Sequence, residues 1–346
     1  MHRTAGDGIL GGMETFRVLT ALRVLFVWIL VSCVLCPAFC RADDYKGWRK
    51  KHPKWKLVFS DDFKGKRLNT KKWNRVRYEP GNRADWRRYQ SSDDELVTVN
   101  GNSTVSLWGK FGPYTSQNDP EGTAEGYACG GIFTDQSFAF QYGYVEVRAK
   151  FDCAQGAWPA IWLMPTDGSS WPAKGEIDIM EHLNSDNTVY QTIHYKNASG
   201  GRTSKALRQG AAVFDSARDR EAFHTYGVEW TEEGVTFYMD GKVTGSCPTE
   251  ENNPNWPFNM EDNPFYLLLD MQLGGSWVGR IDREAVGDGV AMTIDYVRVY
   301  ADPRSVVRLS SDADREEKAG KDSKAGKTKA TPRKKTTSKK TKRRSK

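Results

Sequence analysis

The stretch Gly-Glu-Ile-Asp-Ile-Met-Glu-His at residues 175–182 decides the fold and the chemistry expected of this chain. Side chains alternate between the two faces of an extended strand, so Glu176 and Asp178 share one face and the isoleucines share the other. Strict alternation would place Glu181 on the isoleucine face. One extra residue, a β-bulge at residues 179–180, would return Glu181 to the side of the other two acids. We therefore predict a strand with an apolar face toward a core and three carboxylates on its opposite face.

The neighbouring sequence favours a functional reading of these acids. Acids that alternate with isoleucine are usually the solvent-exposed face of an amphipathic strand. Here, however, the tryptophan-bearing run GAWPAIWLMP at residues 156–165 precedes the acids, and QTIHY at residues 191–195 follows them. A solvated strand does not need tryptophans beside its acids. Two glutamates on one face with an aspartate between them are a common arrangement for cleaving a glycosidic bond.

The rest of the chain has the pattern of an all-β protein. Short alternating stretches separated by Gly, Asn or Asp recur at residues 96–99, 104–108, 235–239 and 265–271. Asp240-Gly241 is a strong signal for a tight hairpin, and only residues 216–223 suggest a short helix. Repeated short strands with turn signals predict one all-β sandwich or barrel over residues 43–302.

The acidic strand resembles the active-site strand of glycoside hydrolase family 16. The similarity rests on residues 175–181 with Trp158, Trp162 and His194 around them, and it extends over roughly residues 55–301. It is closest to the laminarinase-like branch, which has the extra bulge residue. The resemblance implies a concanavalin A-like β-jelly roll with a concave cleft, and an endo-acting retaining β-glycosidase that hydrolyses internal linkages of a polysaccharide or glycan.

The resemblance also implies roles for the acids. Glu176 would be the nucleophile and Glu181 the general acid/base, while Asp178 would bind the nucleophile and hold a negative field that keeps Glu181 protonated. His194 would contact this group or the sugar; a histidine with only structural hydrogen bonds is the alternative. The spacing itself leaves retention and inversion both open, so retention and a covalent intermediate on Glu176 follow from the resemblance alone.

Several other residues are candidates for substrate binding. Indole rings offer an apolar surface that matches the C–H patches of sugars, although tryptophans in a sandwich also fill cores. The candidate indoles are Trp158, Trp162, Trp171, Trp86 and Trp277. The predicted binding residues are Trp158, Trp162, His194, Trp86, Arg88, Gln272 and Trp277.

One segment departs from the laminarinase pattern. Laminarinases commonly carry a Trp-Asn-x-Glu segment early in the domain, whereas residues 85–90 here read DWRRYQ. Arginine offers donors only. The change leaves room for galactose-containing chains, sulfated chains or host O-glycans as substrates, unless Arg87 and Arg88 are simply surface charges.

No cofactor is expected for catalysis. The family resemblance suggests a structural calcium ion away from the cleft, for which Asp62 and Asp295 are the candidate ligands; the sequence has no oxygen-rich loop of the calcium-binding type.

The N-terminal 42 residues are predicted to be a signal peptide. Arg17 and Arg23 precede an apolar run at residues 24–35, and Cys-Arg-Ala at residues 40–42 gives a small-x-small cleavage site. We therefore expect an exported protein without a transmembrane span in its mature form, with a lipoprotein tether at Cys33 as the second choice.

Removal of this leader would leave three cysteines, Cys129, Cys153 and Cys247. They form neither a disulfide framework nor a zinc cluster. One pair could bridge in an oxidising compartment, or all three could stay as free thiols.

Residues 303–346 are predicted to form a disordered basic tail. Residues 310–346 carry a net charge of +10, whereas the whole chain carries +7. The tail has no aromatic residues and cannot bury enough apolar surface to fold. In an exported protein its expected partner is an anionic polymer or surface rather than a specific nucleic acid; a solubilising tail is the alternative.

Two other functions fit the same fold. A lectin-like carbohydrate-binding module would use the aromatic groove without needing the two glutamates. A transglycosylase would share the nucleophile but pass the sugar to another chain instead of to water.

Overall fold

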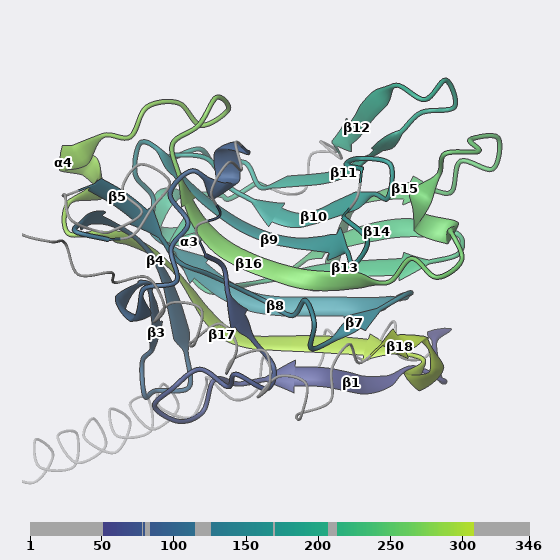
Figure 1. Ribbon diagram of the computed structural model, residues 1–346, viewed down its shortest axis with the longest axis horizontal. Coiled ribbons are helices and arrows are strands. Elements are labelled where there is room, and N and C mark those ends of the chain that lie inside the picture. The colour runs from purple at the N-terminus through teal and green to yellow at the C-terminus, as the bar shows by residue number, and fades with distance from the viewer. Residues whose placement is uncertain are drawn as a thin grey trace, which may run out of the picture.

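The computed structural model of the protein describes residues 51–77, 79, 84–114, 126–168, 170–206 and 213–307. It consists of two β-sheets stacked face to face (Figure 1). Adjacent strands within each sheet are antiparallel. The prediction of an all-β sandwich is confirmed.

The first sheet, sheet A, contains nine strands in the order β15-β14-β13-β8-β17-β4-β3, with β1 beside β17 and β5 beside β4. Their bounds are β1 Lys56–Asp61, β3 Val97–Val99, β4 Val105–Gly112, β5 Gly126–Cys129, β8 Gly143–Phe151, β13 His224–Thr231, β14 Gly234–Met239, β15 Lys242–Pro248 and β17 Val290–Ala301.

The second sheet, sheet B, has the order β12-β11-β10-β9-β16-β6-β2, and β7 joins β16 to β18. Their bounds are β2 Asn74–Arg75, β6 Gly131–Phe133, β7 Ala139–Phe140, β9 Ala157–Pro165, β10 Glu176–Glu181, β11 Tyr190–Lys196, β12 Arg202–Ala206, β16 Phe265–Leu273 and β18 Val306–Val307.

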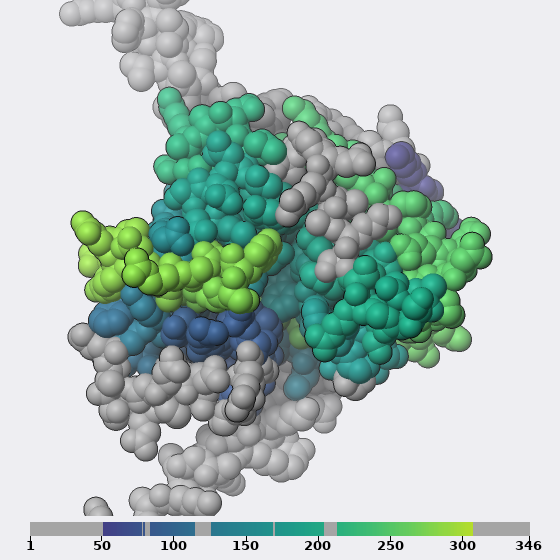
Figure 2. All heavy atoms as spheres, turned by 90° about the horizontal axis from the view of Figure 1, so that it is seen from above, coloured from purple at the N-terminus to yellow at the C-terminus, as the bar shows by residue number. Residues whose placement is uncertain are grey.

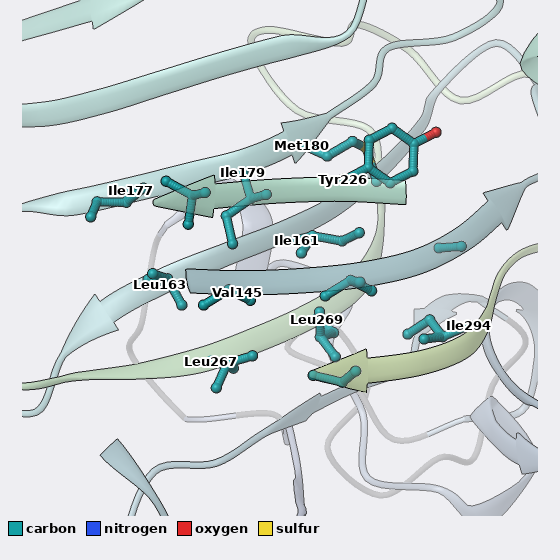
Figure 3. Packing of buried hydrophobic residues seen from close by; sticks show 14 of the residues in the cluster. Val145, Ile161, Leu163, Ile177, Ile179, Met180, Tyr226, Leu267, Leu269 and Ile294 are labelled. Atoms are coloured by element: carbon teal, nitrogen blue, oxygen red, sulfur yellow. The ribbon is translucent and has the colours of Figure 1, made fainter. Parts of the chain in front are cut away.

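The core lies between the sheets because the strands alternate apolar and polar residues. In β8, Val145, Val147 and Ala149 are fully buried, and the residues between them are only partly buried. Ile177 and Ile179 of β10, in sheet B, belong to the same buried hydrophobic cluster (Figure 3). Removing apolar side chains from water contributes roughly 25 cal/mol per Å². This interface therefore fixes which face of β10 turns outward.

The short connections also follow the sequence pattern. Asp240 and Gly241 have φ values of 50° and 72° and join β14 to β15, as expected for a type I′ hairpin. The predicted short helix is α3 (Ala217–Arg220), whose N-cap Ser216 accepts a hydrogen bond from the backbone N–H of Asp219. The other short helices are α4 (Arg283–Val286), η1 (Asp85–Arg87), η2 (Asp94–Leu96), η3 (Pro257–Asn259) and η4 (Pro303–Ser305).

The sandwich continues past the predicted boundary at residue 302. After η4, β18 pairs with β7, with Val306 opposite Phe140. The predicted tail therefore contributes residues 303–307 to the fold, and its remainder lies outside the described residues, as does the predicted leader at residues 1–42. Among the described helices, none combines the length and the apolar character needed to cross a bilayer.

The outer face of sheet B is concave. Figure 1 shows β9, β10 and β16 bending so that their ends rise away from sheet A. Viewed onto this face, the surface is hollowed between the yellow-green segment after β16 and the green-to-teal segments across from it (Figure 2).

Candidate active site

The three acids of β10 reach the concave face through a break in the strand register. Asp178 lies opposite Trp162 of β9, but the next aligned pair is Met180 with Ile161, which leaves Ile179 as the extra residue. The pairing with β11 shifts in the same interval. The predicted bulge at residues 179–180 is therefore confirmed, and both of its residues are fully buried in the core.

A glycine sets the start of this strand. Gly175 has a φ of +89°, and a Cβ atom there would lie 3.0 Å from side-chain atoms of Phe258 and Pro257. Only glycine avoids both the steric cost of this backbone conformation and the crowding. The turn lets β10 begin at Glu176, directly opposite His194 of β11.

Each glutamate accepts a hydrogen bond from an indole N–H. Nε1 of Trp171 donates to Oε2 of Glu176 at 2.7 Å, and Nε1 of Trp158 donates to Oε1 of Glu181 at 2.9 Å. Between them, Asp178 is only 2 % exposed. Nε2 of His194 lies 3.1 Å from Oδ2 of Asp178 and 3.6 Å from Oε1 of Glu176. The site thus links three carboxyls and one imidazole.

The surroundings make ionisation of the acids unequal. Burial, and then the charge of Asp178, raise the pKa of Glu176, while His194 and the N–H of Trp171 lower it. Burial, and then the charge of Asp178, raise the pKa of Glu181 well above its usual value, and the N–H of Trp158 opposes them. Burial also raises the pKa of Asp178, opposed by a hydrogen bond with Glu176. His194 lies against Glu176 and Asp178 and favours a negative charge at Glu176. The proton on Glu181 is favoured instead by burial and by the charges of Asp178 and Glu176.

Aromatic side chains border the acids. The ring of Trp158 meets Trp277 edge to face at 5.5 Å, and Trp277 meets Tyr190 at 5.1 Å. On the other side lies Trp171. Trp277 and Trp171 are 45 % and 44 % exposed, so two accessible indoles are available for sugar rings near the acids.

A buried polar network lies in the same face of sheet B. Asp270 of β16 is fully buried and accepts hydrogen bonds from Trp162 Nε1 (3.0 Å), Gln272 Nε2 (3.2 Å) and Gln90 Nε2 (3.0 Å). Burial raises the pKa of Asp270 to about 7. Trp162 and Gln272, both predicted as substrate-binding residues, are buried in this face, and each donates a hydrogen bond to Asp270.

The early arginine segment lies beside this floor. Trp86 packs edge to face on Trp162 at 4.9 Å, and the guanidinium of Arg87 covers the Trp86 ring at 4.4 Å. Arg88 instead forms an ion pair with Asp85 at 2.8 Å. Asp85 also accepts hydrogen bonds from the backbone N–H and hydroxyl of Ser276. Arg88 thus supports the contact between η1 and the loop after β16, and its charge is already balanced.

The predicted calcium ligands are engaged by arginines. Asp62 accepts from Arg298 at 2.5 Å, and Asp295 accepts from Arg148 at 2.6 Å. Of the described residues, the group with the spacing of a metal site is Glu176, Asp178 and His194. Because arginine guanidinium groups already neutralise Asp62 and Asp295, these two carboxylates do not fit a calcium site. A structural calcium ion elsewhere stays a prediction.

Two residues of the site make contacts that the sequence did not predict. Trp171, one of the candidate indoles for sugar binding, lies in the loop between β9 and β10, and its hydrogen bond to Glu176 was not predicted. Asp270 lies in an apolar strand, where an isolated acid is itself the signal of a buried network. No disulfide bond joins Cys129, Cys153 and Cys247 in the described part of the chain.

The fold and site define a β-sandwich whose concave face carries clustered acids and accessible indoles, the arrangement of a glycan-processing protein. The sequence profile described as Glycosyl hydrolases family 16 matches residues 88–298. The chain belongs to this family, and the predicted resemblance is confirmed.

Similar proteins include characterised glycan-degrading enzymes. The chain is 33 % identical over 226 residues to a keratan-sulfate endo-1,4-beta-galactosidase of Sphingobacterium multivorum, covering 63 % of this chain and 49 % of that protein. It is 35 % identical over 190 residues to a beta-glucanase of Rhodothermus marinus, covering 50 % and 62 %. The chain thus spans about half to three fifths of the length of these two relatives.

Solved structures agree on the fold. The laminarinase catalytic domain of Thermotoga maritima superposes with a TM-score of 0.59 at 32 % identity, covering 72 % of this chain and 98 % of that one. A structure reported under a title on endo-acting O-glycanases of the human gut microbiota that initiate mucin breakdown gives 0.61 at 28 % identity, covering 73 % and 92 %. The sandwich is therefore the jelly roll of this family.

Proposed function

We propose that this protein is an endo-acting, retaining β-glycosidase that hydrolyses internal linkages of a polysaccharide or glycan. The observation that carries the proposal is the bulge at Ile179, which brings Glu181 to the face of Glu176 and Asp178. Incubation of the purified protein with laminarin, lichenan, agarose, porphyran, keratan sulfate and mucin glycans tests it. Release of oligosaccharides from at least one polymer, with an early fall in chain length, is expected. The proposal fails if every polymer stays intact.

The acids would act in two steps. Glu176 attacks the anomeric carbon while Glu181 gives its proton to the departing glycosidic oxygen, which leaves a glycosyl ester on Glu176. Glu181, now ionised, then takes a proton from a water molecule whose oxygen attacks the same carbon and releases Glu176. The different surroundings of the two glutamates support these roles. His194 lies 3.6 Å from Glu176 and favours its ionised form, whereas Glu181 pairs across the strands with Tyr190.

The substrate would lie along the concave face, stacked on indole rings. Trp158, Trp171 and Trp277 adjoin the acids and support this placement. Similarity to a keratan-sulfate endo-galactosidase and to an O-glycanase structure supports galactose-containing glycans beside β-glucans as candidate substrates.

Replacing Asp178 with Asn is expected to move the whole pH–activity profile to lower pH, by about one unit. Activity rises as Glu176 ionises and falls as Glu181 loses its proton. The charge of Asp178 raises the pKa of both glutamates, so its removal lowers both limbs. Measurement of kcat/KM against pH checks this, with Asp167→Asn as a control that removes an exposed carboxylate. An unmoved profile would contradict the assigned role of Asp178.

We further infer that the protein is exported and that its basic C-terminal segment binds anionic polymers. The charged n-region and apolar run of residues 1–42 support export, and the net charge of +10 in residues 310–346 supports the second inference.

Removal of residues 310–346 is expected to leave the turnover of small soluble oligosaccharides unchanged. It should lower retention on a sulfated resin, most strongly at low salt, because exposed charges are screened as ionic strength rises. Elution from sulfated and uncharged resins of the same matrix is the measurement. Equal retention of both forms at every salt concentration would refute a binding role.

A further inference from the structure

Two cations lie directly opposite each other at the turn end of the β11–β12 hairpin. Lys196 of β11 is aligned with Arg202 of β12, just as His194 is aligned with Ser204. Residues two apart in a strand share a face, so Lys196 lies on the concave face with His194. The cation pair is therefore about 7 Å along the strand from the pair formed by His194 and Glu176.

Nothing in the described fold neutralises these two charges. Neither side chain forms an ion pair with an acid among the described residues; the guanidinium of Arg202 is exposed and lies over the ring of Trp171, 5.2 Å from its centre. Like charges directly opposite in a sheet are destabilising. The other arginines near the cleft differ, because Arg87 pairs with Glu79 and Arg88 with Asp85.

Trp171 connects this pair to the acids. Its ring carries Arg202 on one side, its N–H donates to Glu176 at 2.7 Å, and it is nearly half exposed. The cations are thus beside the site of bond cleavage but do not touch its carboxylates in any described contact. Their position suits the sugar next to the reacting one.

We propose that Lys196 and Arg202, the cationic rim, bind an anionic substituent on a sugar adjacent to the cleaved linkage. The substituent is a sulfate ester or a carboxylate, to which the fork of Arg202 can present two N–H groups. The ionised acids of β10 repel an anionic glycan, and the rim offsets this repulsion on one side of the cleft. This inference rests on the proposed function and specifies its substrate class.

The test compares matched substrates and matched variants. The neutral glycan that the protein cleaves fastest is prepared in three forms: unmodified, sulfated at its C6 hydroxyls, and oxidised at C6 to the carboxylate. Initial rates give kcat/KM for the wild type, Arg202→Gln, Lys196→Gln, the double variant, and Lys242→Gln, which removes an exposed charge at the β14–β15 turn.

The double variant is expected to lose roughly tenfold in kcat/KM on the anionic forms, the size of one good charge-assisted contact. Its kcat/KM on the neutral form should change less than about twofold. The loss on the anionic forms should become smaller at high salt. Loss on the sulfated form alone assigns the rim to sulfate, and loss on both anionic forms assigns it to charge. Equal losses on neutral and anionic forms would mean that Arg202 only supports Trp171, and would overturn the proposal, as would no loss at all.

If the wild type cleaves no glycan, the proposed hydrolase function fails separately. The rim is then tested by equilibrium binding of keratan sulfate and its desulfated form. A preference for the sulfated form that the double variant loses supports the rim; equal binding by wild type and variant overturns it.

Discussion

Glu176→Gln is expected to lower kcat by at least about 10⁴-fold while leaving glycan binding within a few-fold of wild type. The amide lacks the negative charge needed to attack the anomeric carbon. It keeps the shape of the side chain, and its oxygen can still accept the hydrogen bond from Trp171. Turnover of the best polymer substrate and calorimetric titration with a product oligosaccharide measure the two effects.

Glu233→Gln is the matched control, because Glu233 is exposed in the turn between β13 and β14. It should behave as wild type. A Glu176→Gln protein with more than about one hundredth of the wild-type rate would rule out the nucleophile assignment. Retained binding together with a wild-type protein that never forms product would instead indicate a lectin-like module.

Glu181→Gln is expected to slow the reaction by a factor that depends on the leaving group of the substrate. Polymers, whose departing alkoxide needs a proton, should react about 10² to 10⁴-fold more slowly. Aryl glycosides with an acidic phenol should lose far less in the first step, since the phenolate leaves without protonation. Their second step stays slow because no base activates water, so a burst of phenol followed by a slow steady state is expected.

Stopped-flow release of the phenol checks this behaviour. The conservative variant Glu181→Asp serves as a comparison, since it keeps a carboxyl but withdraws it from Trp158. Equal losses on polymers and activated glycosides would contradict a proton-donating role for Glu181.

The core-facing side of β10 was predictable because alternation is a local property. Ile177 and Ile179 turn inward, and the extra residue of the bulge lets Met180 turn inward as well, which leaves Glu181 on the side of Glu176. The resemblance also placed His194 on a neighbouring strand, whereas its register opposite Glu176 is set by the pairing between β10 and β11.

The polar contacts of the site could not be predicted in the same way. Asp270 receives its hydrogen bonds from Gln90, Trp162 and Gln272, which come together only when η1, β9 and β16 are assembled. Gln272 was predicted at the cleft from its position, yet its buried amide serves Asp270.

The arginine segment shows a second limit. The ion pair of Arg88 with Asp85, three residues apart, is visible in sequence, but the anchoring of Ser276 by the same carboxylate is not. The cationic rim likewise depends on a register that aligns Lys196 with Arg202 across six residue positions. Long-range pairing, not local pattern, decides such contacts.

The proposed mechanism requires that the bulge in β10 places an ionised Glu176 and a protonated Glu181 on the same face, beside one sugar. The most direct test uses the Glu181→Gln variant. The variant reacts with an activated aryl glycoside, the reaction is quenched during the slow phase, and peptide mapping by mass spectrometry locates any bound sugar. A glycosyl mass increment on Glu176 is the predicted result. Product of inverted configuration with no labelled peptide, or a label on another residue, would contradict the account.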